Sequence, residues 1–192
     1  NSRYNPTPKQ LVKSMTDIRK RYPEAREFST WNEASLNKRP EMVARWWKAL
    51  SKSCPKCTVL GVDLLDVGDV SGWARRFVKA AGRAPKVWGL HNYVGMNRRS
   101  TRSTLKLMKA VRGKFWLTET GGIVRRNNGS KIVLPTGVPH AAAVTKFILG
   151  PMLKAGGSRI ERVYLYHWTP GPTWDSAFVG PNNETRPSLT AL

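Results

Sequence analysis

Hydrophobic residues recur along the chain in two alternating patterns. Segments with apolar positions three and four residues apart, which are typical of helices, alternate with short apolar and β-branched runs, which are typical of buried strands. The clearest helical segment begins at Pro40, and its apolar stripe at i, i+3, i+4 and i+7 consists of Val43, Trp46, Trp47 and Leu50. The chain therefore predicts a repetition of strand and helix.

The same patterns predict where each element lies. Strands are expected over residues 26–31, 58–62, 86–93, 114–118 and 162–168. Helices are expected over residues 8–22, 72–81, 101–112 and 139–155 and from Pro40, with the start of another at 187–192. Thr7 and Gln10 fit a capping box, Ser71 fits an N-cap, and Pro151 is expected to kink its helix.

The predicted strands are too apolar to have one face in water. Such strands belong to a parallel sheet covered by helices, either an open doubly wound sheet or a closed (β/α)8 barrel. The sequence contains neither the Gly-x-Gly-x-x-Gly fingerprint of a dinucleotide-binding sheet nor a P-loop. Polar residues gather instead at the carboxyl ends of the strands, which form the active face of barrel enzymes. The sequence therefore favours an α/β fold of the TIM-type barrel class.

Two of the scarce acidic residues stand at the ends of apolar runs. Glu33 follows the strand at 26–31, and Glu119 follows the run Phe115-Trp116-Leu117-Thr118. A carboxylate in such a place must be paired, hydrogen-bonded or functional, because burying it alone is costly. Asp63 and Asp66 flank another apolar run and are expected to cap the turn that follows it.

The charge of the chain is strongly positive. Its 192 residues include 33 Lys and Arg but only 12 Asp and Glu, which gives a net charge of +21. Such a field attracts polyanions, including anionic glycans and, non-specifically, nucleic acid. The basic residues are spread along all the predicted helices and form no single stripe, so the charge alone identifies no partner. No apolar run approaches the roughly 18 residues of a membrane span.

The two cysteines lie close together, in Cys54-Pro55-Lys56-Cys57. One such pair is half of a zinc site, and the three histidines that would have to complete it are scattered along the chain. A local disulfide or two inert thiols are therefore favoured over metal or redox chemistry. No metal and no cofactor are expected.

Several strand ends together resemble the clan A glycoside hydrolases, which are (β/α)8-barrel retaining glycosidases. Asn32-Glu33 matches the end of their fourth strand, and Glu119 matches the glutamate that ends their seventh. His91-x-Tyr93 is similar to the sixth-strand pattern, and Trp168 falls where the eighth strand carries an aromatic residue. The segments Trp174-Asp175-Ser176 and Thr185-Arg186-Pro187 are similar to the tail of bacterial members.

The resemblance implies a role for each of these residues. Glu33 would be the acid/base and Glu119 the nucleophile of a hydrolase that cleaves β-glycosidic bonds by double displacement. Asn32 would bind the sugar 2-hydroxyl, and Tyr93 would donate a hydrogen bond to Glu119. His91 and His167 would line the pocket, and Trp168 would stack on the sugar. The resemblance also implies a secreted or cell-surface bacterial protein of carbohydrate metabolism, although the sequence shows no signal peptide.

Each of these residues also has an ordinary structural explanation. Glu33 and Glu119 would then be ion-pair partners of the many basic residues, Asn32 an Asx-turn residue, and Trp168 part of the core. At least one of His91 and Tyr93 would be packing alone, and His140 is expected at the surface. Under that interpretation the protein is a non-catalytic, basic glycan- or polyanion-binding barrel fragment.

The length of the chain is short for the predicted fold. A complete barrel typically takes about 250 residues, whereas the resemblance maps residues 1–192, taken as one domain, to barrel units four through eight. The first three units are absent from this sequence. We therefore expect either a longer chain or a partner chain or second copy that completes the barrel around a carbohydrate substrate. Arg125-Arg126 would usually be a solvated pair, but it follows Glu119 in the loop where an anionic glycan would contact it.

Overall fold

The computed structural model describes residues 4–127 and 129–192. Its strands are short and follow one another at intervals along the chain. They are β1 (Glu27–Ser29), β2 (Thr58–Leu60), β3 (Asp63–Leu65), β4 (Val87–His91), β5 (Lys114–Thr120), β6 (Arg125–Arg126), β7 (Ile160–Leu165) and β8 (Trp174–Asp175).

Helices fill most of the chain between these strands. The α-helices are α1 (Pro8–Arg21), α2 (Pro40–Ser53), α3 (Val70–Ala81), α4 (Tyr93–Asn97), α5 (Arg102–Ala110), α6 (Val138–Phe147) and α7 (Leu153–Gly156). Short 3-10 helices are η1 (Ala34–Leu36) and η3 (Gly157–Arg159), and η2 (Ile148–Met152) is a π-helical segment. In the described part of the chain no helix is long and apolar enough to cross a membrane.

The parallel strands follow one another in sequence order across the sheet. β1 pairs with β2, and β3, β4, β5 and β7 form a four-stranded sheet in that order. β2 and β3 are two halves of one extended segment, because only residues 61 and 62 separate them and Gly61 donates its N–H to Val87 of β4. The predicted strand–helix repetition and parallel pairing are therefore confirmed.

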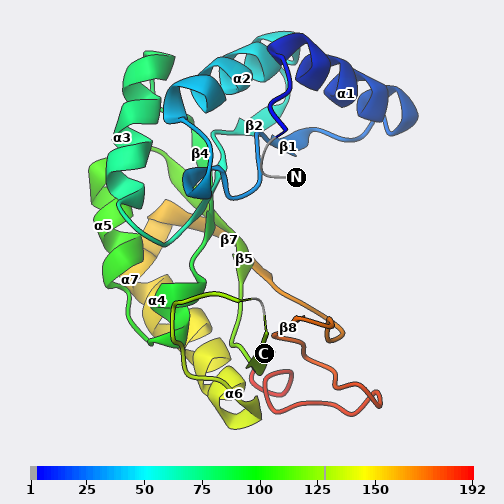
Figure 1. Cartoon of the computed structure of the whole chain (residues 1–192), viewed down its shortest axis with the longest axis vertical. Coiled ribbons are helices and arrows are strands. Elements are labelled where there is room, and N and C mark those ends of the chain that lie inside the picture. Colours follow the sequence, from blue (N-terminus) through cyan, green and yellow to red (C-terminus); the bar gives the residue numbers. More distant parts are fainter. Residues whose placement is uncertain (1–3, 128) are drawn as a thin grey trace.

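The sheet and its helices form an open arc. Figure 1 shows α2, α3 and α5 along the outer side of this arc, with the strands on its inner side. In residues 4–127 and 129–192, β1 and β7 each have a parallel partner on one side only. The arrangement is that of a segment of a barrel wall, in which helices cover one face and the strands line the other.

The main core lies between the sheet and the outer helices. The predicted stripe of α2 is buried as expected, with Val43, Trp46, Trp47 and Leu50 each at most 4% exposed. Phe77 of α3 bridges the layers, because its ring centroid lies 5.8 Å from that of Trp47 and 5.3 Å from that of Trp88 in β4. Aromatic contacts of this kind fix the helices against the strands.

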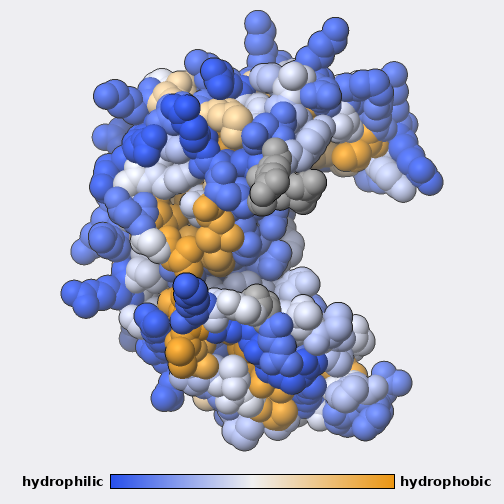
Figure 2. All heavy atoms as spheres, in the orientation of Figure 1, coloured by the Kyte–Doolittle hydropathy of each residue, from blue (hydrophilic) through white to orange (hydrophobic). Residues whose placement is uncertain are grey.

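The inner face of the arc is less well covered. Leu60, Val87 and Trp116 form a small separate cluster there. The guanidinium of Arg162 on β7 lies 4.0 Å from the Trp116 ring centroid and pairs with Glu27 of β1 at 2.6 Å. A side-chain ion pair thus links the first and last parallel strands, which do not pair with each other. Figure 2 shows hydrophobic residues in the middle of the arc, while hydrophilic residues project from its outer edge.

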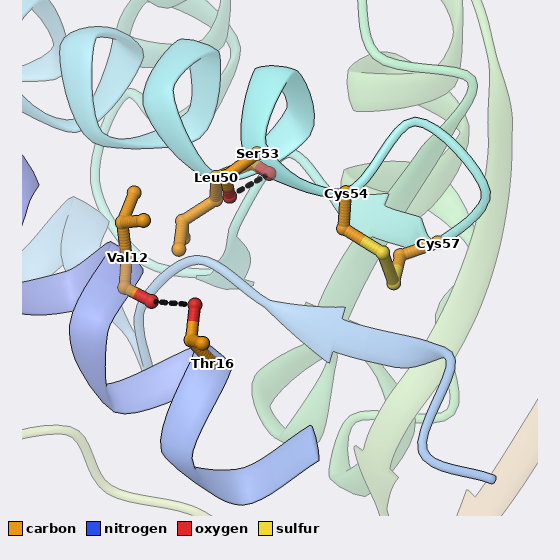
Figure 3. The surroundings of a disulfide bond; sticks show 6 residues. All are labelled: Val12, Thr16, Leu50, Ser53, Cys54 and Cys57. Carbon is orange, nitrogen blue, oxygen red and sulfur yellow. Dashed lines mark hydrogen bonds between the residues drawn. A yellow bond between two sulfur atoms is a disulfide. The ribbon is translucent and has the colours of Figure 1, made fainter. Parts of the chain in front are cut away.

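The cysteines form a local bond that joins a helix to a strand. Cys54 directly follows α2 and Cys57 precedes β2, and the structure links them in a disulfide that closes this turn (Figure 3). Of the two states that the sequence left open, the structure therefore has the disulfide.

Several predicted boundaries are wrong in detail. Asp69, and not Ser71, caps α3, because the Asp69 carboxylate accepts the Gly72 N–H at 3.0 Å and Ser71 is a buried residue of the helix. Residues 187–192 form turns and not a helix. The capping box at α1 is confirmed, and the expected distortion at Pro151 takes the form of η2, since proline has no N–H to continue the α-helical ladder.

The longer loop after β5 contains structure that the sequence did not suggest. β6 lies within it and pairs with β8 in an antiparallel ribbon, with Arg125 opposite Asp175 and Arg126 opposite Trp174. This ribbon brings the C-terminal segment back over the carboxyl end of β5.

Candidate active site

A cavity of about 420 Å³ lies at the carboxyl ends of the parallel strands. Its wall includes two carboxylates, Glu33 and Glu119, and three aromatic residues, Tyr93, Tyr166 and Trp174. Arg126 and residues 130, 132 and 134 of the loop after β6 also line it. The strand ends and the β6–β8 ribbon therefore enclose one shared space, as expected for the active face of a barrel.

Glu33 is held by the turn that follows β1. Its backbone has φ +46° and ψ +38°, the left-handed conformation that residues other than glycine rarely adopt, and it precedes η1 directly. The Ser35 hydroxyl accepts the Leu65 N–H at 3.1 Å, which fastens η1 to β3. A strained residue is often found at a functional site, where the surrounding structure holds the side chain in one direction.

His91 joins the two carboxylates. Its Nδ1 lies 3.1 Å from Oε1 of Glu33, its Nε2 lies 3.7 Å from Oε1 of Glu119, and its side chain is only 1% exposed. β4 ends at His91 and pairs in register with Glu119 of β5, which explains the second contact. One imidazole therefore sets the relative positions of both acids.

Tyr93 approaches Glu119 from the other side. Its hydroxyl donates to Oε2 of Glu119 at 3.3 Å, which is the contact that the resemblance implied. The sequence placed His91 and Tyr93 on one strand, which is wrong, because the strand ends at His91 and Tyr93 begins α4. Burial raises the pKa of Tyr93, and the charge of Glu119 raises it further, so the phenol stays a hydrogen-bond donor.

Asp66 fixes the start of α4. Its carboxylate accepts the Val94 N–H at 3.0 Å and the Gly95 N–H at 2.6 Å. Burial raises the pKa of Asp66 to about 6, although these N–H groups oppose the shift. The expectation that Asp63 and Asp66 cap the turn after β3 is wrong. Asp63 instead accepts the Thr118 hydroxyl of β5 at 2.6 Å, across the space left open by Gly89.

Asn97 connects α4 to the wall of the cavity. Its Nδ2 donates to the carbonyls of Tyr93 and Gly121, and its Oδ1 accepts the Ile123 N–H at 2.8 Å. Nε2 of His140 lies 3.1 Å from the same oxygen, so His140 is not the plain surface residue that the sequence suggested. A fully buried, fully used amide of this kind locks the loop after β5 onto the helix that carries Tyr93.

The electrostatics of the carboxylate pair are set by burial and by His91. Burial raises the pKa of Glu119, and the negative Glu33 adds to this, while His91 and the Tyr93 hydroxyl oppose it. For His91, burial alone would lower the pKa, but the hydrogen bond to Glu33 and the charges of Glu119 and Asp63 raise it overall. The two acids therefore stabilise the protonated form of His91 relative to the neutral form.

Four predicted site residues do not line the cavity, and one of them, the buried His91, lies behind the two glutamates and contacts both. Asn32 is exposed and does not line it, since only the side chain of the following Glu33 turns inward. β7 ends at Leu165, short of the predicted end, so Tyr166 is the residue at the strand end and reaches the cavity. Trp168 is 61% exposed, and the His167 ring stacks on Tyr166 at 4.3 Å between centroids without lining the cavity.

Sequence reasoning missed Tyr166 and Trp174 as cavity residues, whereas Arg126 belongs to a loop pair that the sequence had already placed near the nucleophile. A signal for Trp174 was present in the tail segments, which the structure joins: Asp175 and Arg186 form a buried bidentate ion pair with N–O distances of 2.7 and 2.9 Å. This pair holds the ribbon that carries Trp174, whose ring lies 4.8 Å from that of Tyr93. Nothing in the sequence pointed to Tyr166.

The site offers no place for a metal among the described residues. In residues 4–127 and 129–192, no three His, Cys, Asp or Glu side chains come together in a way that could hold a metal ion. The polar side chains that line the cavity include two carboxylates, two phenols and a guanidinium.

Comparison with known proteins places this geometry in a fold. No protein-family model matches the chain, and no curated protein sequence does. Among solved structures, xylanase 10B of Thermotoga maritima matches with a TM-score of 0.65 and 14% sequence identity. The match covers 98% of this chain and 67% of the xylanase chain. A GH39 β-xylosidase of Caulobacter crescentus matches with a TM-score of 0.66 and 16% identity, over 97% of this chain and 47% of its own. The chain has the fold of part of a TIM-barrel glycosidase.

A third TIM-barrel glycosidase was solved with a saccharide bound. It is an intracellular xylanase of Thermoanaerobacterium saccharolyticum in complex with xylotriose, and it matches with a TM-score of 0.64 and 12% identity, over 96% of this chain and 63% of its own. The chain therefore spans between 47% and 67% of the length of these structures. At such identities the likeness establishes the fold and leaves the roles of individual residues as predictions.

The charge state of His91 provides a test of the site geometry. The chain has only three histidines, so their ring signals can be followed separately by NMR. We expect His91 to titrate above its ordinary value of 6.5, and we expect Glu33→Gln to lower that pKa. The exposed Glu24→Gln removes the same charge elsewhere and should leave His91 unchanged. A His91 pKa below 6.5, or one indifferent to Glu33→Gln, would contradict the bridging geometry.

The raised pKa of His91 also determines the direction in which the stability of the fold changes with pH. A histidine whose pKa is higher in the folded than in the unfolded state stabilises the fold when protonated. The contribution of His91 is therefore complete below about pH 6.5 and is lost as the pH rises through its folded-state pKa.

Proposed function

We propose that this protein is a retaining glycoside hydrolase that cleaves β-glycosidic bonds of an oligo- or polysaccharide. The observation that carries the proposal is that Glu33 and Glu119 line one cavity and both contact the same buried imidazole. A double displacement needs two carboxyl groups at one site, one as nucleophile and one as acid and base, and these two glutamates are the pair that the cavity offers. The TIM-barrel glycosidase fold supports the same chemistry by analogy.

Glu119 is proposed as the nucleophile. Its carboxylate attacks the anomeric carbon and forms a glycosyl ester while the glycosidic C–O bond breaks. The Tyr93 hydroxyl donates a hydrogen bond to Oε2 of Glu119, and His91 lies beside Oε1. The hydrogen bond and the imidazole stabilise the charged form that attack requires.

Glu33 is proposed as the acid and base. It donates a proton to the departing glycosidic oxygen, and its carboxylate then takes a proton from a water molecule that attacks the glycosyl ester. This second displacement frees Glu119 and restores the configuration at the anomeric carbon. His91 contacts both acids, so its imidazole is placed to interact with each carboxylate as its charge changes during the reaction.

The sugar is proposed to lie against the aromatic wall of the cavity. Tyr166 and Trp174 line it, and aromatic faces of this kind bury the apolar side of a sugar ring. The roles predicted for Asn32, His167 and Trp168 stay predictions, because they would require a substrate that extends beyond the cavity.

We further propose that the chain represents barrel units four through eight. Its support is the order β1, β2–β3, β4, β5 and β7, which supplies five consecutive parallel positions of a barrel wall. The inner face, with Trp116 and the 43%-exposed Tyr164, is the side that the remaining units of a closed barrel would cover. Those units could belong to this protein, to a partner chain or to a second copy.

The stereochemistry of the product tests the proposed reaction. An aryl β-glycoside panel (xyloside, glucoside and glucuronide) is incubated with the protein, and the anomeric protons are followed by NMR from the first minutes. We expect the β-anomer of the free sugar to form first and then mutarotate. Initial release of the α-anomer would exclude double displacement by Glu119.

A non-catalytic, polyanion-binding protein is the second candidate, because the net charge of +21 favours it. It predicts no turnover of any glycoside in the panel, together with salt-sensitive binding to heparin and to nucleic acid alike. That result would replace the enzyme proposal.

An extracellular or cell-surface location is also proposed. The Cys54–Cys57 disulfide supports it, since disulfides persist mainly in oxidising compartments. The protein is taken directly from the cell fraction that contains it and treated with a thiol reagent. The reaction reports whether the Cys54–Cys57 disulfide is formed in that compartment. Two free thiols would count against this location.

A further inference from the structure

We propose that Arg126 selects substrates that carry a carboxylate, so that the sugar bound in the cavity is a hexuronic acid or an oligosaccharide that contains one. This inference rests on the proposed glycosidase function and narrows its substrate class. It depends on the position of Arg126, on the charge of the cavity and on the hydrogen-bonding capacity of the guanidinium.

The β6–β8 ribbon determines where Arg126 points. Arg126 lies opposite Trp174 in the ribbon, and both residues line the cavity. Successive residues of a strand face opposite ways, and Arg125 accordingly turns away. Its guanidinium donates to the carbonyls of Pro172 and Gly171 at 3.0 and 3.1 Å. Two adjacent arginines therefore have separate environments.

The charge of the cavity makes Arg126 distinctive. Among the described residues that line the cavity, it is the only basic one, and Glu33 and Glu119 are the only acidic ones. An anionic sugar beside these carboxylates would be repelled without a cation nearby. Arg126 supplies that cation on the aromatic side of the wall, next to Trp174.

The Arg126 guanidinium has more N–H donors than its hydrogen bond within the protein uses. Arginine carries five N–H donors in a planar fork that matches a carboxylate. One of its groups donates to the carbonyl of Ile132, which holds the loop that follows β6. Among the described residues Arg126 makes no ion pair, whereas Arg162 and Arg186 are both paired with acids. A half-buried, uncompensated guanidinium at a cavity wall is suited to bind an anionic ligand.

An alternative explanation is that Arg126 only anchors the loop through Ile132. That role predicts equal losses for charged and neutral ligands when Arg126 is replaced. Recognition of a carboxylate predicts a loss confined to the charged ligand. The two explanations therefore differ in how replacing Arg126 changes the ratio of the affinity for a charged ligand to the affinity for a neutral one.

The experiment measures binding and turnover of two matched aryl β-glycosides, the glucuronide and the glucoside, at 150 mM NaCl. The variants are Arg126→Gln, Arg126→Lys and, as a control with the same loss of charge on the neighbouring residue, Arg125→Gln. We expect Arg126→Gln to weaken glucuronide binding about tenfold to a hundredfold, since a charge-assisted pair contributes roughly 1.5–3 kcal/mol. Glucoside binding should change less than about twofold, and Arg126→Lys should restore part of the loss.

The outcomes separate this inference from the proposed function. Hydrolysis of either glycoside with an unchanged glucuronide-to-glucoside ratio in Arg126→Gln would overturn the role of Arg126 and leave the glycosidase intact. An equal effect of Arg125→Gln would show that the overall positive charge attracts the ligand, and it would also overturn the inference. Selective binding of the glucuronide without hydrolysis would support the role of Arg126 and contradict the glycosidase.

Discussion

Glu119→Ala is expected to lower the turnover of an activated aryl β-glycoside by at least about a thousandfold, because the nucleophile that forms the glycosyl ester is gone. Sodium azide should restore turnover by occupying the space that the side chain leaves and attacking the anomeric carbon itself. That single displacement gives the α-glycosyl azide. Product analysis by NMR checks both the loss and the configuration.

Glu33→Ala should behave differently from Glu119→Ala. An aryl leaving group needs little proton donation, so the glycosyl ester still forms on Glu119, and azide then displaces it with a second inversion. The product should be the β-glycosyl azide. The exposed Glu24→Ala is the control, and it should match the unmodified protein. Reversed azide configurations would exchange the two roles, and normal activity of Glu119→Ala would refute the assignment.

Arg186→Met is expected to destabilise the fold by about 3 kcal/mol, because it leaves the Asp175 carboxylate buried without its partner. The two side chains are only 7% and 5% exposed, and both oxygens of Asp175 are bonded to the guanidinium. The urea midpoint measures the change. The loss should shrink at acid pH, because the Arg186 bond lowers the pKa of Asp175 against the effect of burial, and stability of that kind disappears as pH falls through the lowered value.

The matched control is the exposed Lys13–Asp17 pair of α1, which has a 2.6 Å contact. Asp17→Asn removes it and should leave the urea midpoint unchanged within error, since solvent screens such pairs. The double variant Asp175→Asn/Arg186→Met should be less destabilised than the sum of its single changes. Additive losses would mean that the pair does not hold the C-terminal segment to β8.

Local sequence was sufficient where one element decides the outcome. The stripe of α2, the capping box of α1 and the order of the parallel strands all follow from periodicity and terminal residues, and the structure has them. The carboxylates at the strand ends could also be predicted to meet, because the carboxyl ends of parallel strands share one edge.

Local sequence was insufficient to predict where a strand ends and which way the side chains after it point. The short shift at the end of β4 moved Tyr93 from a strand to the start of α4, and the early end of β7 put Tyr166 where Trp168 was expected. A one-residue change in where a strand ends turns the following side chains to another face. The hydrophobic pattern alone does not determine such an end.

The sequence by itself determined the class of fold, the positions of Glu33 and Glu119 and the expectation that a barrel of this kind is only partly present. Only the tertiary structure showed that His91 contacts both acids, that Asp175 and Arg186 hold the tail against β8, and that Arg126 and Trp174 share the cavity wall. The reason is that periodicity reports how a segment meets its own core. Contacts between residues that lie 11 to 58 positions apart depend on how strands and loops pack, and no local pattern records that packing.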